Sequence, residues 1–123
     1  MTLGRLDYLY TPSADVDADL RYLVDVLGGE EVFAIEDGGI RVAMVTLGDG
    51  PAILLTDHLE GVRPIHLYAV EAIAAAAAEL DRRGWLRERA VELPPGPAIT
   101  FRTPSGVRLA IYEPSRATLT DLW

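Results

Sequence analysis

Few side chains in this chain of 123 residues can do chemistry. It has two histidines, His58 and His66, and neither cysteine nor lysine. Thiol nucleophiles, cysteine-bound zinc and Schiff-base lysines are therefore excluded. Ser105 has no histidine at a recognisable spacing, so a serine nucleophile has little support. The chemistry left to consider is metal binding by imidazole and carboxylate groups, or hydrogen bonding and acid–base work by tyrosine.

Each of these candidates also has a purely structural interpretation. His66 lies among strand-forming residues, where a lone histidine is more often structural than a metal ligand. Asp57 and His58 could bind a surface ion, but an exposed connecting loop explains them better. Tyr8 is the third residue of the first strand, and a tyrosine with a pKa near 10 needs strong tuning to act as a base.

Composition limits the class of protein. Half of the residues are hydrophobic, which suits one domain with a buried core. The apolar runs are too short for a membrane span and the first residues lack a secretory pattern, so we expect a cytoplasmic protein. The net charge of −8 disfavours nucleic-acid binding and suits a cationic small molecule, although solubility alone explains it.

Two helices must position these residues. Asp15 can cap the first, and an apolar stripe of Val16, Leu20, Leu23 and Leu27 leads to the stop signal Gly28-Gly29. The second helix covers Ala72–Arg83 and ends at Gly84. Stripe residues of the first helix recur 57 positions later, and Gly28 and Gly50 recur 56 positions later as Gly84 and Gly106.

Strand formers and turn residues fill the rest of the chain. Pro12 and Ser13 are expected to end the first strand. The predicted strands are Leu6–Tyr10, Glu31–Glu36, Ile40–Leu47, Ala52–Thr56, Ile65–Val70, Leu86–Glu92, Ala98–Arg102 and Val107–Tyr112. Each half of the chain then follows the order β-α-β-β-β. An α+β domain with accidental internal similarity is the alternative.

Motifs in both halves carry a family resemblance. LDYLYTPSADVDADLRYLVDVLGG resembles the opening of the glyoxalase/bleomycin-resistance/dioxygenase families, the vicinal oxygen chelate superfamily, and FRTPSGVRLAIYEP resembles their ending. The likeness extends from Leu6 to Pro114. It implies an α+β fold of two β-α-β-β-β modules that form a curved mixed sheet around a cavity. We expect a single domain with module one at about 6–57, a linker at 58–64, module two at about 65–113 and a tail at 114–123.

The resemblance also implies where a divalent metal would bind. Family ligands, usually His, Gln or Glu, come from the first and last strand of each module. The matching positions here are Tyr8, Leu54, Ile65 and Ala110. Three of them are apolar, so we expect no metal cofactor. His66 and Glu113 have the opposite strand parity to Ile65 and Ala110, so a bulge would be needed to bring His66 into the site.

Strand parity predicts the lining of the cavity. It indicates a mostly apolar pocket with three tyrosines and one arginine, or a packed core in the same place. Arg108 could pair with a carboxylate or stack on a ring. The predicted ligand-binding residues are Tyr8, Tyr10, Leu54, Thr56, Ile65, Leu67, Arg108, Ala110 and Tyr112, with Ala52 and Ala69 on the same faces.

Three functions remain open. The favoured hypothesis is a metal-free binder of an aromatic or cationic compound, because the resemblance includes bleomycin-resistance proteins that sequester a drug at a dimer interface without metal. A lyase, isomerase or dioxygenase with displaced ligands, or with Tyr8, Tyr112 or Glu113 as acid–base residues, is the second. The third is an interaction module with a vestigial cavity. We also expect a homodimer, since Leu122 and Trp123 in the tail would otherwise be exposed.

Overall fold

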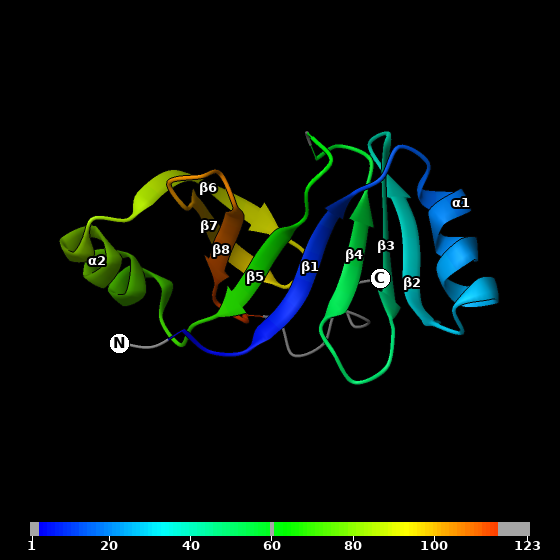
Figure 1. Cartoon of the computed structure of the whole chain (residues 1–123), viewed down its shortest axis with the longest axis horizontal. Coiled ribbons are helices and arrows are strands. Elements are labelled where there is room, and N and C mark those ends of the chain that lie inside the picture. The colour runs from blue at the N-terminus through cyan, green and yellow to red at the C-terminus, as the bar shows by residue number, and fades with distance from the viewer. Residues whose placement is uncertain (1–2, 60, 116–123) are drawn as a thin grey trace. The chain divides into compact units, whose positions relative to one another are not determined.

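The computed structural model describes residues 3–59 and 61–115, so the tail predicted to meet a partner subunit lies almost wholly outside the described residues. The chain forms two compact units (Figure 1). One unit comprises residues 7–64. The other comprises residues 65–115 together with the N-terminal segment 3–6.

The first unit is module one. It contains all of β1 (Leu6–Pro12) after its first residue, together with α1 (Val16–Arg21), a π-helical turn η1 (Tyr22–Val26), β2 (Glu30–Asp37), β3 (Ile40–Thr46) and β4 (Ala52–Thr56). Its strands are ordered β2-β3-β4-β1. The β1–β4 pair is parallel and the other pairs are antiparallel, so the sheet is mixed.

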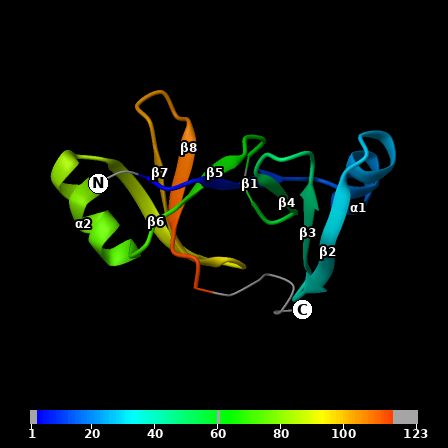
Figure 2. The same cartoon turned by 90° about the horizontal axis from the view of Figure 1, so that it is seen from below.

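The second unit is module two, with the same plan. It contains β5 (Ile65–Ala69), α2 (Ile73–Arg83), β6 (Leu86–Leu93), β7 (Gly96–Arg102) and β8 (Arg108–Tyr112). The strands are ordered β5-β8-β7-β6, again with one parallel pair, β5–β8. In Figure 2 the strands of each unit are curved and each helix lies to one side of its own sheet.

The internal repeat extends to the pairing of individual residues. Tyr10 pairs with Leu54 in module one, and the equivalent residues Leu67 and Ala110 pair in module two. A β-bulge between Glu31 and Phe33 recurs 56 positions later, in β6. The backbone N–H of Ser13 donates a hydrogen bond to the carbonyl of Thr56 (2.8 Å). The same hydrogen bond recurs in module two, from Val70, 57 positions after Ser13, to Tyr112, 56 positions after Thr56 (2.9 Å).

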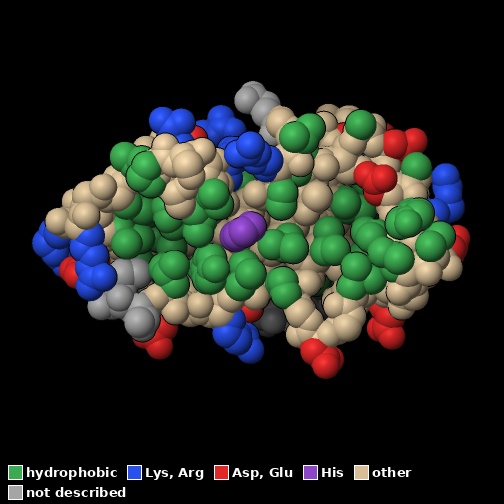
Figure 3. Space-filling view, viewed as in Figure 1, with side chains coloured by type: hydrophobic (Ala, Val, Ile, Leu, Met, Phe, Trp, Pro, Cys, Tyr) green, Lys and Arg blue, Asp and Glu red, His purple; other side chains and the backbone are tan. Residues whose placement is uncertain are grey.

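Each module buries its own helix-facing core. In module one Val16 and Leu20 of α1 pack on Ala43, Val45 and Leu55. In module two the helix contributes alanines, and the buried residues are Val70, Ala76, Ala77, Ile99 and Ile111. Hydrophobic side chains also gather over the face drawn in Figure 3, while charged side chains lie mainly along its margins. Burial of the helix-facing hydrophobic side chains holds each helix to its own sheet.

The structure corrects three local predictions. The first helix is interrupted, because η1 replaces the second half of the predicted α-helix and leaves Leu27 53% exposed. A π-turn shifts later residues around the helix axis, so Leu27 leaves the apolar stripe. Pro12 continues β1 opposite Thr56, and Gly96 and Pro97 join β7, since ladder positions that need no N–H accept proline.

The predicted fold class is confirmed: the chain is an α+β protein of two β-α-β-β-β modules with mixed sheets. That the sheets enclose a ligand cavity stays a prediction. No helix among the described residues has the length and apolar character to span a membrane.

Candidate functional site

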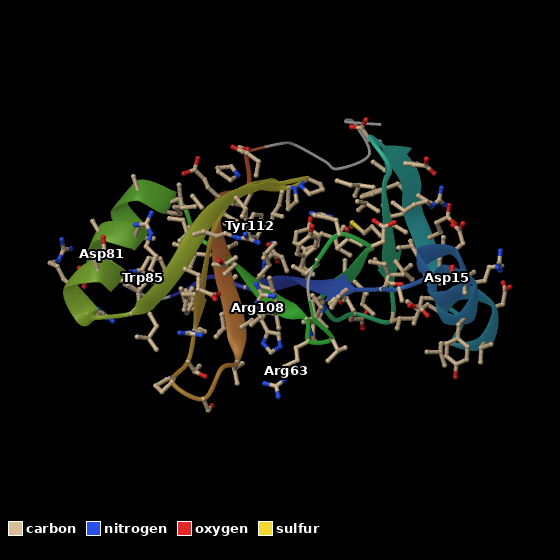
Figure 4. The ribbon with its side chains drawn as sticks, turned by 90° about the horizontal axis from the view of Figure 1, so that it is seen from above. Asp15, Arg63, Asp81, Trp85, Arg108 and Tyr112 are labelled. Atoms are coloured by element: carbon tan, nitrogen blue, oxygen red, sulfur yellow. The ribbon has the colours of Figure 1, made fainter. Side chains whose placement is uncertain are left out.

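The predicted ligand-binding residues share one face of the sheet within each module. In module one Leu55 and Ala43 face α1, so the alternate residues Tyr8, Tyr10 and Thr56 lie on the opposite face. In module two the same reasoning places Leu67, Ala110, Tyr112 and Arg108 opposite the α2 face. Figure 4 shows Arg108 and Tyr112 at the two ends of β8.

Most of these residues are buried. Tyr8 and Arg108 are partly exposed, whereas the other seven of the nine are at most 4% exposed. Leu54, Leu67 and Ala110 have no exposed surface at all. A ligand that reaches these positions must displace packed side chains. The burial therefore agrees better with a packed core than with an open pocket. Their role in binding stays a prediction.

A polar cluster that the sequence did not predict lies at the end of β1 and β4. His58 Nε2 is 3.2 Å from the Tyr10 hydroxyl, and His58 Nδ1 is 2.6 Å from Oγ1 of Thr56. The imidazole lies edge-on to the Tyr10 ring, with 6.1 Å between centroids. Tyr10 and Thr56 are buried and His58 is exposed. We call Tyr10, Thr56 and His58 the hydroxyl–imidazole cluster.

The neighbouring residue Asp57 fixes the backbone that carries His58. The N–H of Arg41 donates to Asp57 Oδ1 (3.1 Å), and the N–H of Asp57 donates to the carbonyl of Arg41 (3.3 Å). The Arg41 guanidinium pairs in turn with Asp17 and Glu36. Asp57 therefore ties the end of β4 to β3 by hydrogen bonds, and His58 follows directly after it.

The phenols of this face are held neutral. Burial raises the pKa of Tyr10 above its usual value of 10, and a hydrogen bond from the Thr56 side chain offsets part of that rise. The pKa of Tyr8 is raised by burial and by the nearby Asp7 carboxylate. Neutral phenols donate and accept hydrogen bonds but are poor general bases at neutral pH.

Solved structures with a similar fold identify the architecture. Methylmalonyl-CoA epimerase from Mycobacterium tuberculosis has 21% identity and a TM-score of 0.72, with 94% of each chain covered. A methylmalonyl-CoA epimerase from Streptomyces coelicolor in complex with 2-nitronate-propionyl-CoA has 18% identity and a TM-score of 0.69, covering 94% of this chain and 100% of that one. A glyoxalase/bleomycin resistance protein/dioxygenase superfamily member from Vibrio splendidus has 18% identity and a TM-score of 0.62, covering 91% and 98%.

The chain has the vicinal oxygen chelate fold. The resemblance seen in the sequence is confirmed at the level of the fold. Neither protein-family models nor curated protein sequences match the chain.

The residues that the sequence resemblance matched to the family's metal ligands do not fit a divalent cation. Leu54 and Ala110 are fully buried and Ile65 is 2% exposed, and none of the three has a donor atom. Tyr8 offers only a phenol whose pKa is raised. A cation there would lose its water and gain almost nothing in return. Among residues 3–59 and 61–115, no three His, Asp or Glu side chains cluster as a metal site elsewhere.

His66 and Glu113, the residues that a shifted strand register would bring to the metal site, make other contacts in the structure. His66 pairs with Leu109 on the α2 side of the sheet, and the β5–β8 ladder runs without the bulge that would turn it round. Oε1 of Glu113 accepts the N–H of Ile73 at 2.9 Å. This carboxylate caps the start of α2, where the N-cap residue Ala72 has no side-chain acceptor.

Module two also carries a surface groove, about 1170 Å³ in volume, between the N-terminal segment and α2. Its walls carry two carboxylates and two guanidiniums, so formal charge is balanced there: Glu71, Glu79, Arg5 and Arg82. The groove is lined by Leu3, Gly4, Arg5, Ala69, Val70, Glu71, Ala72, Ala75, Ala76, Glu79, Arg82 and Pro114. None of the nine predicted ligand-binding residues contributes to it, and Ala69 is the one residue of the predicted lining faces that does.

Proposed function

We propose that this protein binds a small organic molecule without a metal ion. The observation that carries the proposal is the chemistry of the four metal positions of the fold, where three buried apolar side chains accompany a neutral phenol. With a single neutral phenol oxygen among them, those positions suit organic surface better than a cation.

The residues of these faces indicate the ligand class. Aromatic rings and aliphatic side chains favour a flat or apolar body. Each module also has one partly exposed polar side chain on its face, Tyr8 in module one and Arg108 in module two. The net charge of −8 favours an aromatic or cationic compound over an anion. We further propose that the protein acts in the cytoplasm as a homodimer, as the sequence analysis led us to expect.

A metal-free lyase or isomerase has less support. Such an enzyme needs a base, and the raised pKa values of Tyr8 and Tyr10 oppose that role. Glu113 is already used as a helix cap, and Tyr112 is only 2% exposed. The likeness to methylmalonyl-CoA epimerases at about 20% identity concerns the fold.

The extensive burial favours one other candidate, an interaction module whose cavity is filled by its own side chains. Seven of the nine predicted binding residues are at most 4% exposed. This candidate predicts that small molecules leave the melting temperature unchanged.

Elemental analysis and a ligand screen test the proposal together. The purified protein should contain no stoichiometric divalent metal, and chelation should leave its melting temperature unchanged. Aromatic and cationic compounds should then be screened by thermal shift, where binding to the native state raises the melting temperature. Stoichiometric metal that is lost with stability on chelation would overturn the proposal, and a screen without any stabilising compound would favour the interaction module.

A further inference from the structure

The hydroxyl–imidazole cluster joins two buried hydroxyls to one exposed ring. Tyr10 is 4% exposed and Thr56 is fully buried, yet His58, which bonds both, is exposed. All three lie within module one. Buried hydroxyls need hydrogen-bond partners, and here the partner comes from a side chain that faces solvent.

The imidazole of His58 bridges the two hydroxyls through its two nitrogens. A neutral imidazole has one donor nitrogen and one acceptor nitrogen, and each hydroxyl has one proton to donate. Besides its contact with the ring of His58, Oγ1 of Thr56 accepts the backbone N–H of His58 at 3.4 Å. The ring of His58 can therefore donate to one hydroxyl and accept from the other. A group that takes the place of the His58 ring must therefore be flat and must offer one hydrogen-bond donor and one acceptor side by side.

The fold itself does not require this cluster. The equivalent positions in module two are Leu67, Tyr112 and Pro114, at the offsets of 57 and 56 seen in the strand registers. Leu67 has no exposed surface and packs without any polar partner. An aliphatic residue at position 10 would thus satisfy the architecture, which leaves the polar cluster of module one without a structural necessity.

Direct nucleophilic chemistry does not explain the cluster either. The 2.6 Å contact between Thr56 Oγ1 and His58 Nδ1 has the spacing of a nucleophile and its base. A ligand reaches the buried Thr56 hydroxyl only by displacing His58, however, and that displacement removes the base of the pair. Recognition of a polar group is the remaining chemistry for this arrangement.

We propose that the Tyr10 and Thr56 hydroxyls form a binding subsite that His58 fills in the free protein. A ligand with a neutral azole or amide group, which presents one donor and one acceptor as imidazole does, takes the place of His58. The inference rests on the proposed function and names its ligand class. A carboxylate would bring an unpaired charge among buried groups, and an imidazolium would offer two donors to hydroxyls that also need an acceptor.

Free imidazole is the probe that tests the proposal. The experiment is run at about pH 8.5, where imidazole is neutral. In His58→Ala, imidazole should bind at least about tenfold more tightly than in the wild type, because no side chain competes for the subsite. Adding Tyr10→Phe to His58→Ala should remove that gain, since it deletes the phenol hydroxyl and keeps the ring. His66→Ala is the matched control and should leave imidazole binding at the wild-type level.

The wild type provides a test that needs no variant. Imidazole titrated into the wild-type protein should shift the ring resonances of His58 in NMR spectra and leave those of His66 unchanged. The His58 resonances of the wild type could stay unmoved at imidazole concentrations that saturate His58→Ala. Imidazole would then bind only in the cavity created by the substitution, and the proposal would be overturned. Equal imidazole affinity with and without the Tyr10 hydroxyl would overturn it as well.

The subsite and the proposed metal-free binding function can be refuted independently of each other. A screening ligand that stabilises wild type and Tyr10→Phe equally would refute the subsite while small-molecule binding stands. Stoichiometric metal in the purified protein, together with the expected imidazole behaviour, would refute the metal-free function and leave the subsite in place.

Discussion

The two modules have one backbone plan and two different chemistries. Their strand registers, their β-bulges and the bond that ties the first strand to the last all recur at offsets of 56 or 57 residues. The side chains on the equivalent positions differ: module one has Tyr10, Thr56 and His58 where module two has Leu67, Tyr112 and Pro114. Backbone geometry repeats because ladder bonds depend little on side chains, whereas the side chains of each module are free to specialise.

The helices differ in the same way. Module one caps α1 locally, with Asp15 accepting the N–H of Ala18 at 3.0 Å (Asp15 is labelled in Figure 4). Module two caps α2 from a distant strand, with Glu113. Asp57, the counterpart of Glu113, holds β3 instead. Equivalent carboxylates thus stabilise different backbone groups in the two modules.

The largest effect is expected at the start of β7. Gly96 has φ of 151°, and a Cβ atom there would lie 2.1 Å from the carbonyl oxygen of Glu113. Gly96→Ala should cost more than about 4 kcal/mol of unfolding free energy, since a strained backbone and a steric clash add. Urea unfolding measures it. Ile40, the counterpart that begins β3, is exposed, and Ile40→Ala should cost far less. Equal costs would break the contrast between the two strand starts.

The next effect concerns the equivalent positions 67 and 10. Leu67 has no exposed surface, and Leu67→Ala should cost about 3 kcal/mol through lost burial and the cavity left behind. Leu67→Met, which keeps the volume, is the control for packing alone. Denaturant unfolding of both variants checks this. A cost below about 1 kcal/mol for Leu67→Ala would mean that this face of module two is not a packed core.

Tyr10→Phe keeps the ring and removes only the hydroxyl. It should cost about 1.5 kcal/mol near neutral pH, because His58 loses its hydrogen bond to the phenol. The raised pKa of Tyr10 stabilises the folded state below pH 10, and this contribution is lost as the pH rises through the folded-state value. Wild type should therefore lose stability more steeply than Tyr10→Phe in melting curves taken above pH 10. Parallel curves would show that the phenol ionises as freely in the fold as outside it.

The helix caps give a smaller contrast. Glu113→Ala should cost about 1 kcal/mol, since the N–H of Ile73 loses its acceptor at the start of α2. Glu113→Gln retains an oxygen acceptor and should be nearly neutral. Thermal unfolding and hydrogen exchange at the first turn of α2 measure both variants. A Glu113→Gln variant as unstable as Glu113→Ala would assign the effect to charge and not to the cap.

The smallest effect is electrostatic and confined to module two. Hydrogen bonds from Arg82 and Arg83 lower the pKa of Glu79 below its usual value of 4.5. The ionised carboxylate therefore stabilises the fold above about pH 4.5, and this contribution is lost as the pH falls through the lower folded-state value. Glu79→Gln should melt slightly earlier than wild type near pH 7, with the difference vanishing at low pH. Tyr22, its counterpart in module one, has no charge, so Tyr22→Phe should show no such pH dependence.

The sequence predicted the fold well and the polar cluster poorly. The offsets of 56 and 57 predicted the repeat, and the Ala52–Thr56 strand has its predicted bounds. The opposite parity of His66 was also predicted correctly. His58 was interpreted as a solvated loop residue, because its bond to Tyr10 spans 48 residues and leaves no local pattern. Its spacing of two from Thr56 was the only available signal.

The sequence by itself determined the two-module plan, since alternating apolar residues, caps and glycines act over a few neighbours and specify strands, helices and their ends. Residue type alone also shows that three of the four positions matched to the family's metal ligands, Leu54, Ile65 and Ala110, are apolar. Only the tertiary structure decided that Glu113 caps α2, that η1 interrupts the first helix, and that Tyr10, Thr56 and His58 meet. Those outcomes depend on which distant groups approach within hydrogen-bonding distance, and that is set by the folded sheet rather than by spacing along the chain.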